Sequence, residues 1–148
     1  MITLLETVRA ERPGQQLSHG ASKTRRLYWD LVVGGKPLSS LLPQTLDLIS
    51  PLGWGSPDFH RRAQAELLLE GPASFSEGRR ALLVCPECGD LGCGAISAII
   101  EKRGQLVVWR DFGYQTNYEG TVRTIDLEPL TFDWDRYSAT IQGTAVRE

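Results

Sequence analysis

Three closely spaced cysteines form the segment of this chain with the clearest capacity for chemistry. Cys85 and Cys88 have the Cys-x-x-Cys spacing with a glycine after them, and Cys93 follows a short glycine-containing stretch. Zinc at structural sites takes four tetrahedral ligands, and three cysteines with one histidine form an accepted set. We therefore predict that Cys85, Cys88 and Cys93 bind a metal ion, with zinc as the candidate cofactor. The candidates for the fourth ligand are His19, His60, a carboxylate such as Asp90, water and a residue of another molecule.

Two other interpretations of these cysteines remain open. In a thiol-redox protein, Cys85 and Cys88 would cycle between thiols and a disulfide, with Cys93 as the resolving thiol. Thioredoxin-like proteins, however, place this motif between a strand and a helix, whereas glycines and a strand-like segment follow it here. The other interpretation is inert packing in a tight turn, because free cysteine is among the most buried residue types.

Outside the cysteine segment, no catalytic constellation is evident. The nucleophile-elbow serine pattern and the Gly-x-x-x-x-Gly-Lys phosphate loop are both missing, and we predict no catalytic or cofactor-binding residues. His60 stands beside two arginines near the start of an amphipathic segment, where we expect it to be exposed. A tryptophan on a glycine-flanked loop and several carboxylates are candidates for contact with a partner protein: Trp54, Asp111, Glu119, Asp133 and Asp135.

Composition narrows the class of protein. The 148 residues carry a formal net charge of −2, which argues against nucleic acid or an anionic membrane as partner. No run approaches the roughly 20 apolar residues of a membrane span, and the N-terminus does not resemble a signal peptide. Three cysteines, an odd number, cannot all pair within one chain. We therefore expect a cytoplasmic protein with reduced thiols.

Hydrophobic patterning predicts a single α+β domain over residues 1–148, with residues 11–23 as a flexible loop. Alternating or apolar runs predict strands at 2–8, 27–33, 81–85, 95–102, 106–112 and 121–127, with 95–102 and 106–112 forming a hairpin. Ser56 and Asp133 are predicted to cap two helices. We expect a mainly antiparallel sheet of five to six strands with both helices packed on one face.

Two segments, Leu82 to Gly94 and Val107 to Tyr114, resemble a family of small uncharacterised bacterial proteins with a CPxCGDLGCG loop and a VVWRDFG strand. The resemblance implies a shared fold and a bacterial origin. Some members of that family carry the label oxidoreductase, for which this sequence shows no cofactor motif.

The function expected from these features is a non-enzymatic protein-interaction module, such as an immunity protein or antitoxin. The partner would be another protein, for instance a basic toxin domain, because the second half of the chain has more acidic than basic residues. The alternatives are a thiol-redox protein that uses Cys85, Cys88 and Cys93, and a zinc-stabilised binding module.

Overall fold

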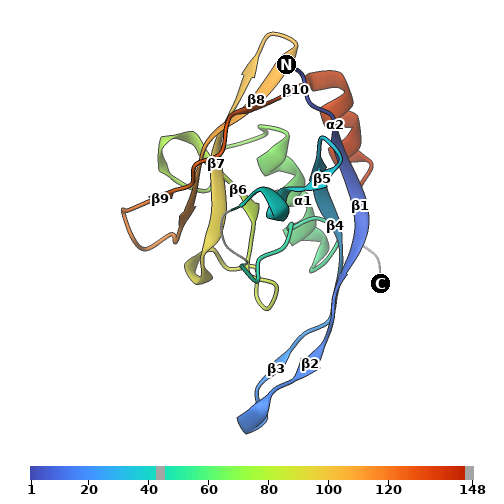
Figure 1. Ribbon diagram of the computed structural model, residues 1–148, viewed down its shortest axis with the longest axis vertical. Coiled ribbons are helices and arrows are strands. Elements are labelled where there is room, and N and C mark those ends of the chain that lie inside the picture. The colour runs from blue at the N-terminus through green and yellow to red at the C-terminus, as the bar shows by residue number, and fades with distance from the viewer. Residues whose placement is uncertain (43–45, 146–148) are drawn as a thin grey trace.

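The structure, a computed structural model, describes residues 1–42 and 46–145 and has an α+β architecture (Figure 1). Two helices, α1 (Pro57–Leu67) and α2 (Trp134–Gln142), accompany strands that pair mostly in antiparallel fashion. The strands fall into a main sheet, a smaller N-terminal sheet and a short two-stranded ladder.

The main sheet is built around a long hairpin. Its strand order is β10 (Leu130–Asp133), β8 (Leu106–Gln115), β7 (Ala95–Arg103) and β6 (Arg79–Leu83), and β9 (Arg123–Thr124) also pairs with β8. The β7–β8 turn contains Gly104 at φ +60°, a left-handed conformation that glycine adopts without steric cost. A shift in the β7–β8 register lies opposite Asp111, which has φ +54°. Such a bulge bends the strand and increases its twist.

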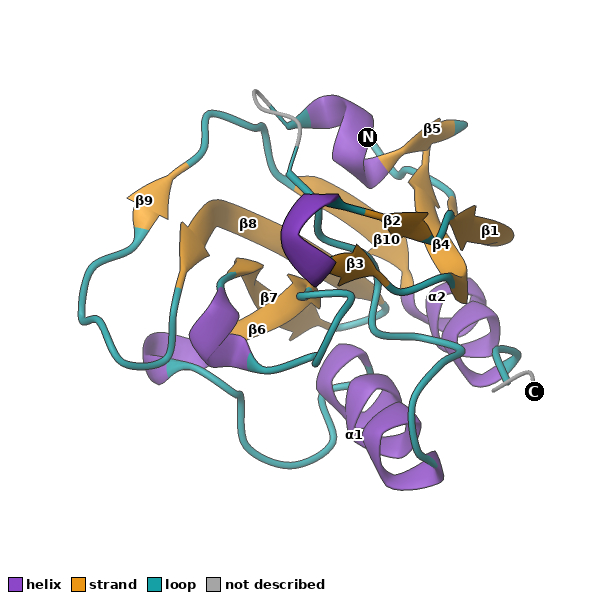
Figure 2. Ribbon diagram, turned by 90° about the horizontal axis from the view of Figure 1, so that it is seen from below, coloured by secondary structure: helices purple, strands orange, loops and turns teal. Residues whose placement is uncertain are grey.

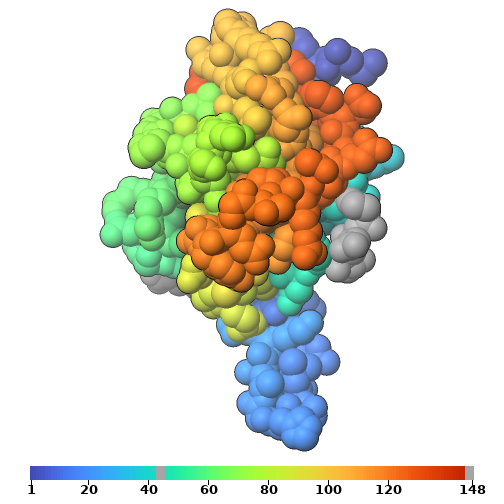
Figure 3. All heavy atoms as spheres, turned by 90° about the vertical axis from the view of Figure 1, so that its left-hand side faces the viewer, coloured from blue at the N-terminus to red at the C-terminus, as the bar shows by residue number. Residues whose placement is uncertain are grey.

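The N-terminal sheet has the order β1 (Leu5–Arg12), β4 (Arg26–Val33) and β5 (Lys36–Pro37). Beyond the β1–β4 pair, β2 (Gln15–Gln16) and β3 (Ser22–Lys23) form a short ladder. Together they make a narrow extension, which we call the arm (residues 13–25), that projects from the body in Figures 1 and 3. A backbone hydrogen bond from Thr3 to Thr131 joins the start of the chain to β10.

Both helices begin at the residues that the sequence indicates. The Ser56 side chain accepts a hydrogen bond from the backbone N–H of Phe59, and Pro57 occupies the first helical turn. Asp133 accepts from the backbone N–H of Arg136 in the same way. Such caps satisfy N–H groups that have no partner within the helix. In the view of Figure 2, α1 and α2 lie near one another, α1 contacting β6 and α2 contacting β10, β8 and β1.

The core consists of two clusters of buried side chains. The larger one joins both sheets and both helices through residues that include Leu31, Leu67, Trp109, Phe132 and Tyr137. The smaller one lies under the segment that connects β6 to β7, and it comprises Ile49, Trp54, Phe75, Ala81, Val84 and Ala95. The cysteine-containing connection therefore rests on its own apolar base.

The predicted α+β class, the two helices, the 95–102 and 106–112 hairpin and the predominance of antiparallel pairing are confirmed. The main sheet has five strands, but the N-terminal strands form a separate sheet. The predicted strand at 121–127 is reduced to Arg123–Thr124, which pairs with Gly113–Tyr114, and Leu130–Asp133 occupies the position beside the start of β8, at Leu106–Trp109. Residues 11–23, predicted as a loop, contain the end of β1 and the β2–β3 ladder.

Candidate metal centre

The three cysteines lie in the connection between two central strands. β6 is buried along its whole length, and its extension at Val84 exchanges backbone hydrogen bonds of 2.9 and 2.7 Å with Ile49. Cys85 follows directly and is half-buried, whereas Cys88 and Cys93 are exposed. A 3₁₀ turn at Leu91–Cys93 leads into β7. The thiols therefore lie at the surface on a rigid base.

The sulfur atoms converge. All three Sγ atoms lie within 4.8 Å of one another, and the Cys88 and Cys93 sulfurs are 3.3 Å apart. Two turns create this arrangement: Gly89 N–H donates to the Cys85 carbonyl at 2.8 Å, and Cys93 N–H donates to the Asp90 carbonyl at 3.1 Å. The structure thus brings together all three cysteines predicted as metal ligands.

Two glycines are required for this path of the chain. Gly89 has φ +69°, and a Cβ at this position would lie 2.6 Å from a ring carbon of Phe59. Gly94 has φ +100°, and a Cβ there would lie 2.2 Å from the hydroxyl oxygen of Tyr114. Side chains larger than hydrogen are excluded by both the backbone conformation and the close approach of a ring. The glycines noted in the sequence therefore fix the shape of the loop.

Backbone N–H groups surround the sulfurs. The Asp90 N–H lies 3.4 Å from the Cys88 sulfur. Burial tends to raise the pKa of Cys85, but N–H groups of Cys88 and Glu87 and the other two thiols act in the opposite direction, and the net pKa is lowered. A hydrogen bond to Cys88 raises the pKa of Cys93 to about 11. These surroundings thus favour the thiolate form of Cys85 and disfavour that of Cys93.

A cluster of charged side chains ties the Cys-x-x-Cys turn to the arm. The Glu87 carboxylate accepts hydrogen bonds from the Thr24 backbone N–H at 2.9 Å, from the Thr24 hydroxyl at 2.7 Å and from the Arg12 guanidinium. These contacts, with those of Thr24 first, hold the pKa of Glu87 at about 2. Arg12 is only 8% exposed and also binds Asp47 through two nitrogens, at 3.1 and 2.7 Å. We call Arg12, Thr24 and Glu87 the clamp.

Arg26 provides a second link between the N-terminal sheet and the turn. Its guanidinium donates to the Pro86 carbonyl at 2.8 Å and to the Glu87 carbonyl at 3.0 Å. The same group lies 4.6 Å from the centre of the Trp54 ring, a distance typical of a cation–π contact. Trp54 in turn packs on Phe59, with ring centroids 4.8 Å apart. In Figure 3 the base of the arm lies against the segment that carries the cysteines.

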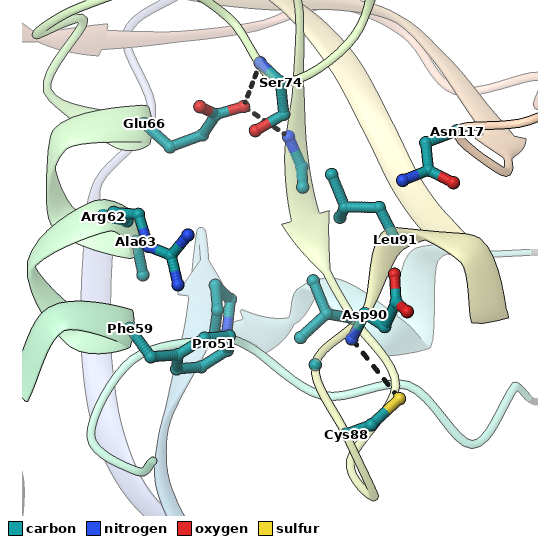
Figure 4. A pocket seen from close by; sticks show the side chains of 13 residues that line it. Pro51, Phe59, Arg62, Ala63, Glu66, Ser74, Cys88, Asp90, Leu91 and Asn117 are labelled. Atoms are coloured by element: carbon teal, nitrogen blue, oxygen red, sulfur yellow. Dashed lines mark hydrogen bonds between the residues drawn. The ribbon is translucent and has the colours of Figure 1, made fainter. Parts of the chain in front are cut away.

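A pocket of about 390 Å³ lies beside the loop, between it and α1 (Figure 4). Arg62 and Glu66 reach into it from the helix, and Leu91 and Asp90 line the opposite wall. One Glu66 oxygen already accepts from the backbone N–H groups of Ser74 and Ala81, each at 3.1 Å. The Cys88 sulfur is turned toward the backbone nitrogen of Asp90 and not toward α1. The pocket therefore borders the loop without being centred on the sulfurs.

None of the side chains considered as a fourth ligand, His19, His60 and Asp90, joins the sulfur cluster. Across residues 1–42 and 46–145, the three cysteines are the only group of three or more potential ligands that converge. Asp90 uses its carboxylate to cap the following turn, accepting from Gly92 N–H at 2.9 Å. His19 lies at the end of the arm.

The expectation that His60 is exposed is wrong. It is 7% exposed, and its Nδ1 accepts a hydrogen bond from the backbone N–H of Gly53 at 3.0 Å. Burial lowers the pKa of His60, and the Thr144 backbone partly offsets this effect. The imidazole is therefore a neutral structural group within the fold.

The residues predicted to contact a partner protein have varied surroundings. Trp54 is only 6% exposed, and its indole N–H donates to the Ser50 carbonyl at 2.8 Å, so the ring serves internal packing. Asp133 caps α2, and Asp111 pairs with Arg110. Glu119 and Asp135 are exposed in the β8–β9 connection and in the first turn of α2. Asp133 and Asp135 lie together at the start of α2, whereas Asp111 and Glu119 lie in β8 and in the β8–β9 connection.

Sequence reasoning missed the clamp and Arg26. Arg12 and Glu87 are 75 positions apart, so no local pattern connects them. The only feature of the sequence that could have indicated the clamp was Glu87, because a charged side chain within the Cys-Pro-Glu-Cys turn needs either a partner or exposure to solvent. The structure shows that the partners of this side chain come from β1 and from the arm: Arg12 and Thr24.

Comparison of the chain with protein-family models, with curated proteins and with solved structures found no match. In the part of the chain that the structure describes, no helix has the length and apolar character needed to cross a membrane.

Proposed function

We propose that this protein binds one zinc ion through Cys85, Cys88 and Cys93 and acts as a zinc-stabilised module. The observation that carries the proposal is the convergence of three thiol sulfurs within 4.8 Å on a loop of fixed shape. Zinc–sulfur bonds of about 2.3 Å in a tetrahedron place the sulfurs about 3.8 Å apart. The sulfurs therefore need to move only slightly to take up that spacing.

The chemistry of the donor set also favours this class of ion. Thiolates select zinc and other soft metals over magnesium and calcium, which prefer oxygen ligands. Backbone N–H groups near Cys85 and Cys88 support negative charge on sulfur, and a bound cation would supply the rest. A fourth position would be filled by water or by a ligand from another molecule.

The place of the site in the fold defines what zinc would do. Both core clusters exclude the cysteines, so the ion would not hold the core together. It would instead fix the β6–β7 connection, whose turn also holds the arm through Glu87 and through Arg26. Metal binding would thus stabilise a surface composed of the loop and the arm. The prediction of an interaction module, such as an immunity protein or antitoxin that binds a basic toxin domain, stays a prediction.

The test is metal content by native mass spectrometry of untagged protein purified under reducing conditions without added metal. We expect one zinc per chain, and we expect its loss in each of Cys85→Ser, Cys88→Ser and Cys93→Ser. His19→Gln, His60→Gln and Asp90→Asn are matched controls that should retain the ion. Cobalt can replace zinc, and its thiolate charge-transfer absorption would report sulfur ligation independently. Protein that carries no metal and gives no such absorption with added cobalt would refute the proposal.

A further inference from the structure

Cys88 and Cys93 differ from Cys85 in their accessibility. Both are exposed, and their sulfurs are in direct contact at 3.3 Å. Cys85 is half-buried at the end of a buried strand. A reagent arriving from solvent therefore meets the Cys88–Cys93 pair first.

The loop between these two residues allows a shorter separation. A disulfide has a sulfur–sulfur bond of about 2.05 Å, so the two atoms would approach by about 1.2 Å. Cys88 and Cys93 both have exposed side chains, and rotation about their side-chain bonds can supply such a movement. The 3₁₀ turn between them, closed by Cys93 N–H to the Asp90 carbonyl, keeps the two residues facing each other.

We infer that Cys88 and Cys93 form a reversible disulfide with a low-molecular-weight disulfide such as glutathione disulfide as oxidant. Cys85 stays a thiol. The disulfide would use two of the three sulfur atoms that bind zinc, so the metal-bound and oxidised forms exclude each other. This mutual exclusion rests on the proposed zinc site, whereas formation of the disulfide does not. The centre is then a redox-responsive one, which holds zinc under reducing conditions and releases it on oxidation.

The reaction proceeds by two exchanges. The Cys88 thiolate attacks one sulfur of glutathione disulfide, the sulfur–sulfur bond of glutathione breaks, and one glutathione leaves as a thiolate. The Cys93 thiolate then attacks the Cys88 sulfur of the mixed disulfide, and the second glutathione leaves. Two electrons pass from the protein to the oxidant, and the two protons lost by the cysteines are taken up by the two glutathione thiolates.

Cys85 is the less suitable partner for either sulfur. Its turn is anchored from two sides, because Gly89 N–H donates to the Cys85 carbonyl and Arg26 holds the carbonyls of Pro86 and Glu87. Pairing Cys85 with Cys88 would require movement of this anchored backbone or of a half-buried side chain. The structure therefore favours Cys88–Cys93 over the Cys85–Cys88 disulfide that the motif alone would indicate.

The sequence permits a direct reading of the connectivity. Glu87 separates Cys85 from Cys88, and Asp90 separates Cys88 from Cys93, so a protease that cleaves after both acids places each cysteine on its own peptide. Reduced, metal-free, full-length protein is treated with glutathione disulfide, alkylated, digested without reduction and analysed by mass spectrometry. We expect one linked pair that contains Cys88 and Cys93, with Cys85 alkylated, and recovery of all three thiols after addition of dithiothreitol. A Cys85–Cys88 link, or glutathione adducts without an internal disulfide, would overturn the inference.

Variants and zinc separate the two proposals. Cys85→Ser should still form the link, whereas Cys88→Ser and Cys93→Ser should give at most a glutathione adduct. One equivalent of zinc should slow formation of the disulfide at least tenfold. Zinc uptake without any disulfide would overturn the inference and leave the metal site standing. A Cys88–Cys93 link that forms at the same rate with and without zinc would contradict metal binding while supporting the disulfide.

Discussion

Replacement of Gly89 by alanine tests whether the shape of the cysteine loop is fixed by its contact with α1. The added Cβ would lie 2.6 and 2.7 Å from two ring carbons of Phe59, well inside normal contact distance. The backbone at this position also has φ +69°. Gly104→Ala is a matched control, because Gly104 has φ +60° and nothing within 4 Å of an added Cβ.

Both substitutions place a side chain in the left-handed backbone conformation, but only Gly89→Ala adds a steric clash with a ring. A non-glycine residue in the left-handed conformation costs about 1–2 kcal/mol, which both variants incur. Overpacking against a ring held in place costs about 1–3 kcal/mol more, and only Gly89→Ala incurs it. We therefore expect the free energy of unfolding to fall by about 2–5 kcal/mol in Gly89→Ala and by about 1–2 kcal/mol in Gly104→Ala.

The assay is urea unfolding of the metal-free proteins, followed by zinc titration of each variant. Movement of the turn away from Phe59 can relieve only part of the clash in metal-free Gly89→Ala, and zinc binding must then restore the fully strained position. A strain of about 1–3 kcal/mol weakens zinc binding roughly five- to 150-fold. Gly104→Ala should bind zinc as the unaltered protein does.

A double-mutant cycle isolates the clash. Phe59→Ala removes the ring that the new Cβ would meet, so the Gly89→Ala change should cost about 1–3 kcal/mol less in that background. Equal destabilisation by Gly89→Ala and Gly104→Ala, with no relief from Phe59→Ala, would show that the ring does not fix the loop.

Three further changes test other parts of the structure. Burial lowers the pKa of His60, so the unfolded chain takes up a proton near pH 6.5 that the folded chain does not. The free energy of unfolding should therefore fall as the pH drops below about 6.5, by at most about 1.4 kcal/mol per pH unit. Urea midpoints between about pH 7.5 and 5.5 should lose this dependence in His60→Gln and keep it in His19→Gln. Tyr137→Phe should lower the free energy of unfolding in urea by about 2–3 kcal/mol, since the hydroxyl donates to the Leu67 carbonyl at 2.7 Å and accepts from a buried indole N–H. Glu87→Gln should speed tryptic cleavage of the arm, whereas Glu11→Gln, which loses only an exposed ion pair, should not.

Each of these three predictions would be contradicted by a particular result. A pH dependence that persists in His60→Gln would assign it to other groups. A Tyr137→Phe variant as stable as the original would mean that the partners of the hydroxyl find other hydrogen bonds. Unchanged cleavage in Glu87→Gln would mean that other contacts, such as those of Arg12 with the Thr24 carbonyl and of Lys23 with Asp47, are sufficient to hold the arm.

Features with a local cause could be predicted from the sequence. Ser56 and Asp133 mark the helix starts because each cap bonds to an N–H only three residues away. The hairpin around Gly104 follows from a short turn between alternating strands. The proximity of the three cysteines belongs to this class too, since their spacing and the glycines between them permit tight turns, whereas the contacts of the loop with Phe59 and Arg26 do not.

Features that depend on distant partners could not be predicted. His60 stands beside two arginines in sequence, but α1 turns it inward, where Gly53 N–H meets its ring. Trp54, on a loop, is covered by Arg26 of the N-terminal sheet. The pattern at 121–127 fits a strand, yet a later segment, Leu130–Asp133, pairs with the start of β8 and only Arg123–Thr124 pairs near its end. In each case tertiary contacts override local pattern, as is usual for β-propensity.

X-ray absorption at the zinc edge, measured on protein loaded with one equivalent of zinc, counts the sulfur atoms bound to the ion. We expect three sulfur ligands at about 2.3 Å and one lighter ligand at about 2.0–2.1 Å. The lighter ligand would be water or a group from another molecule. A coordination shell made only of nitrogen and oxygen would contradict a metal centre formed by Cys85, Cys88 and Cys93.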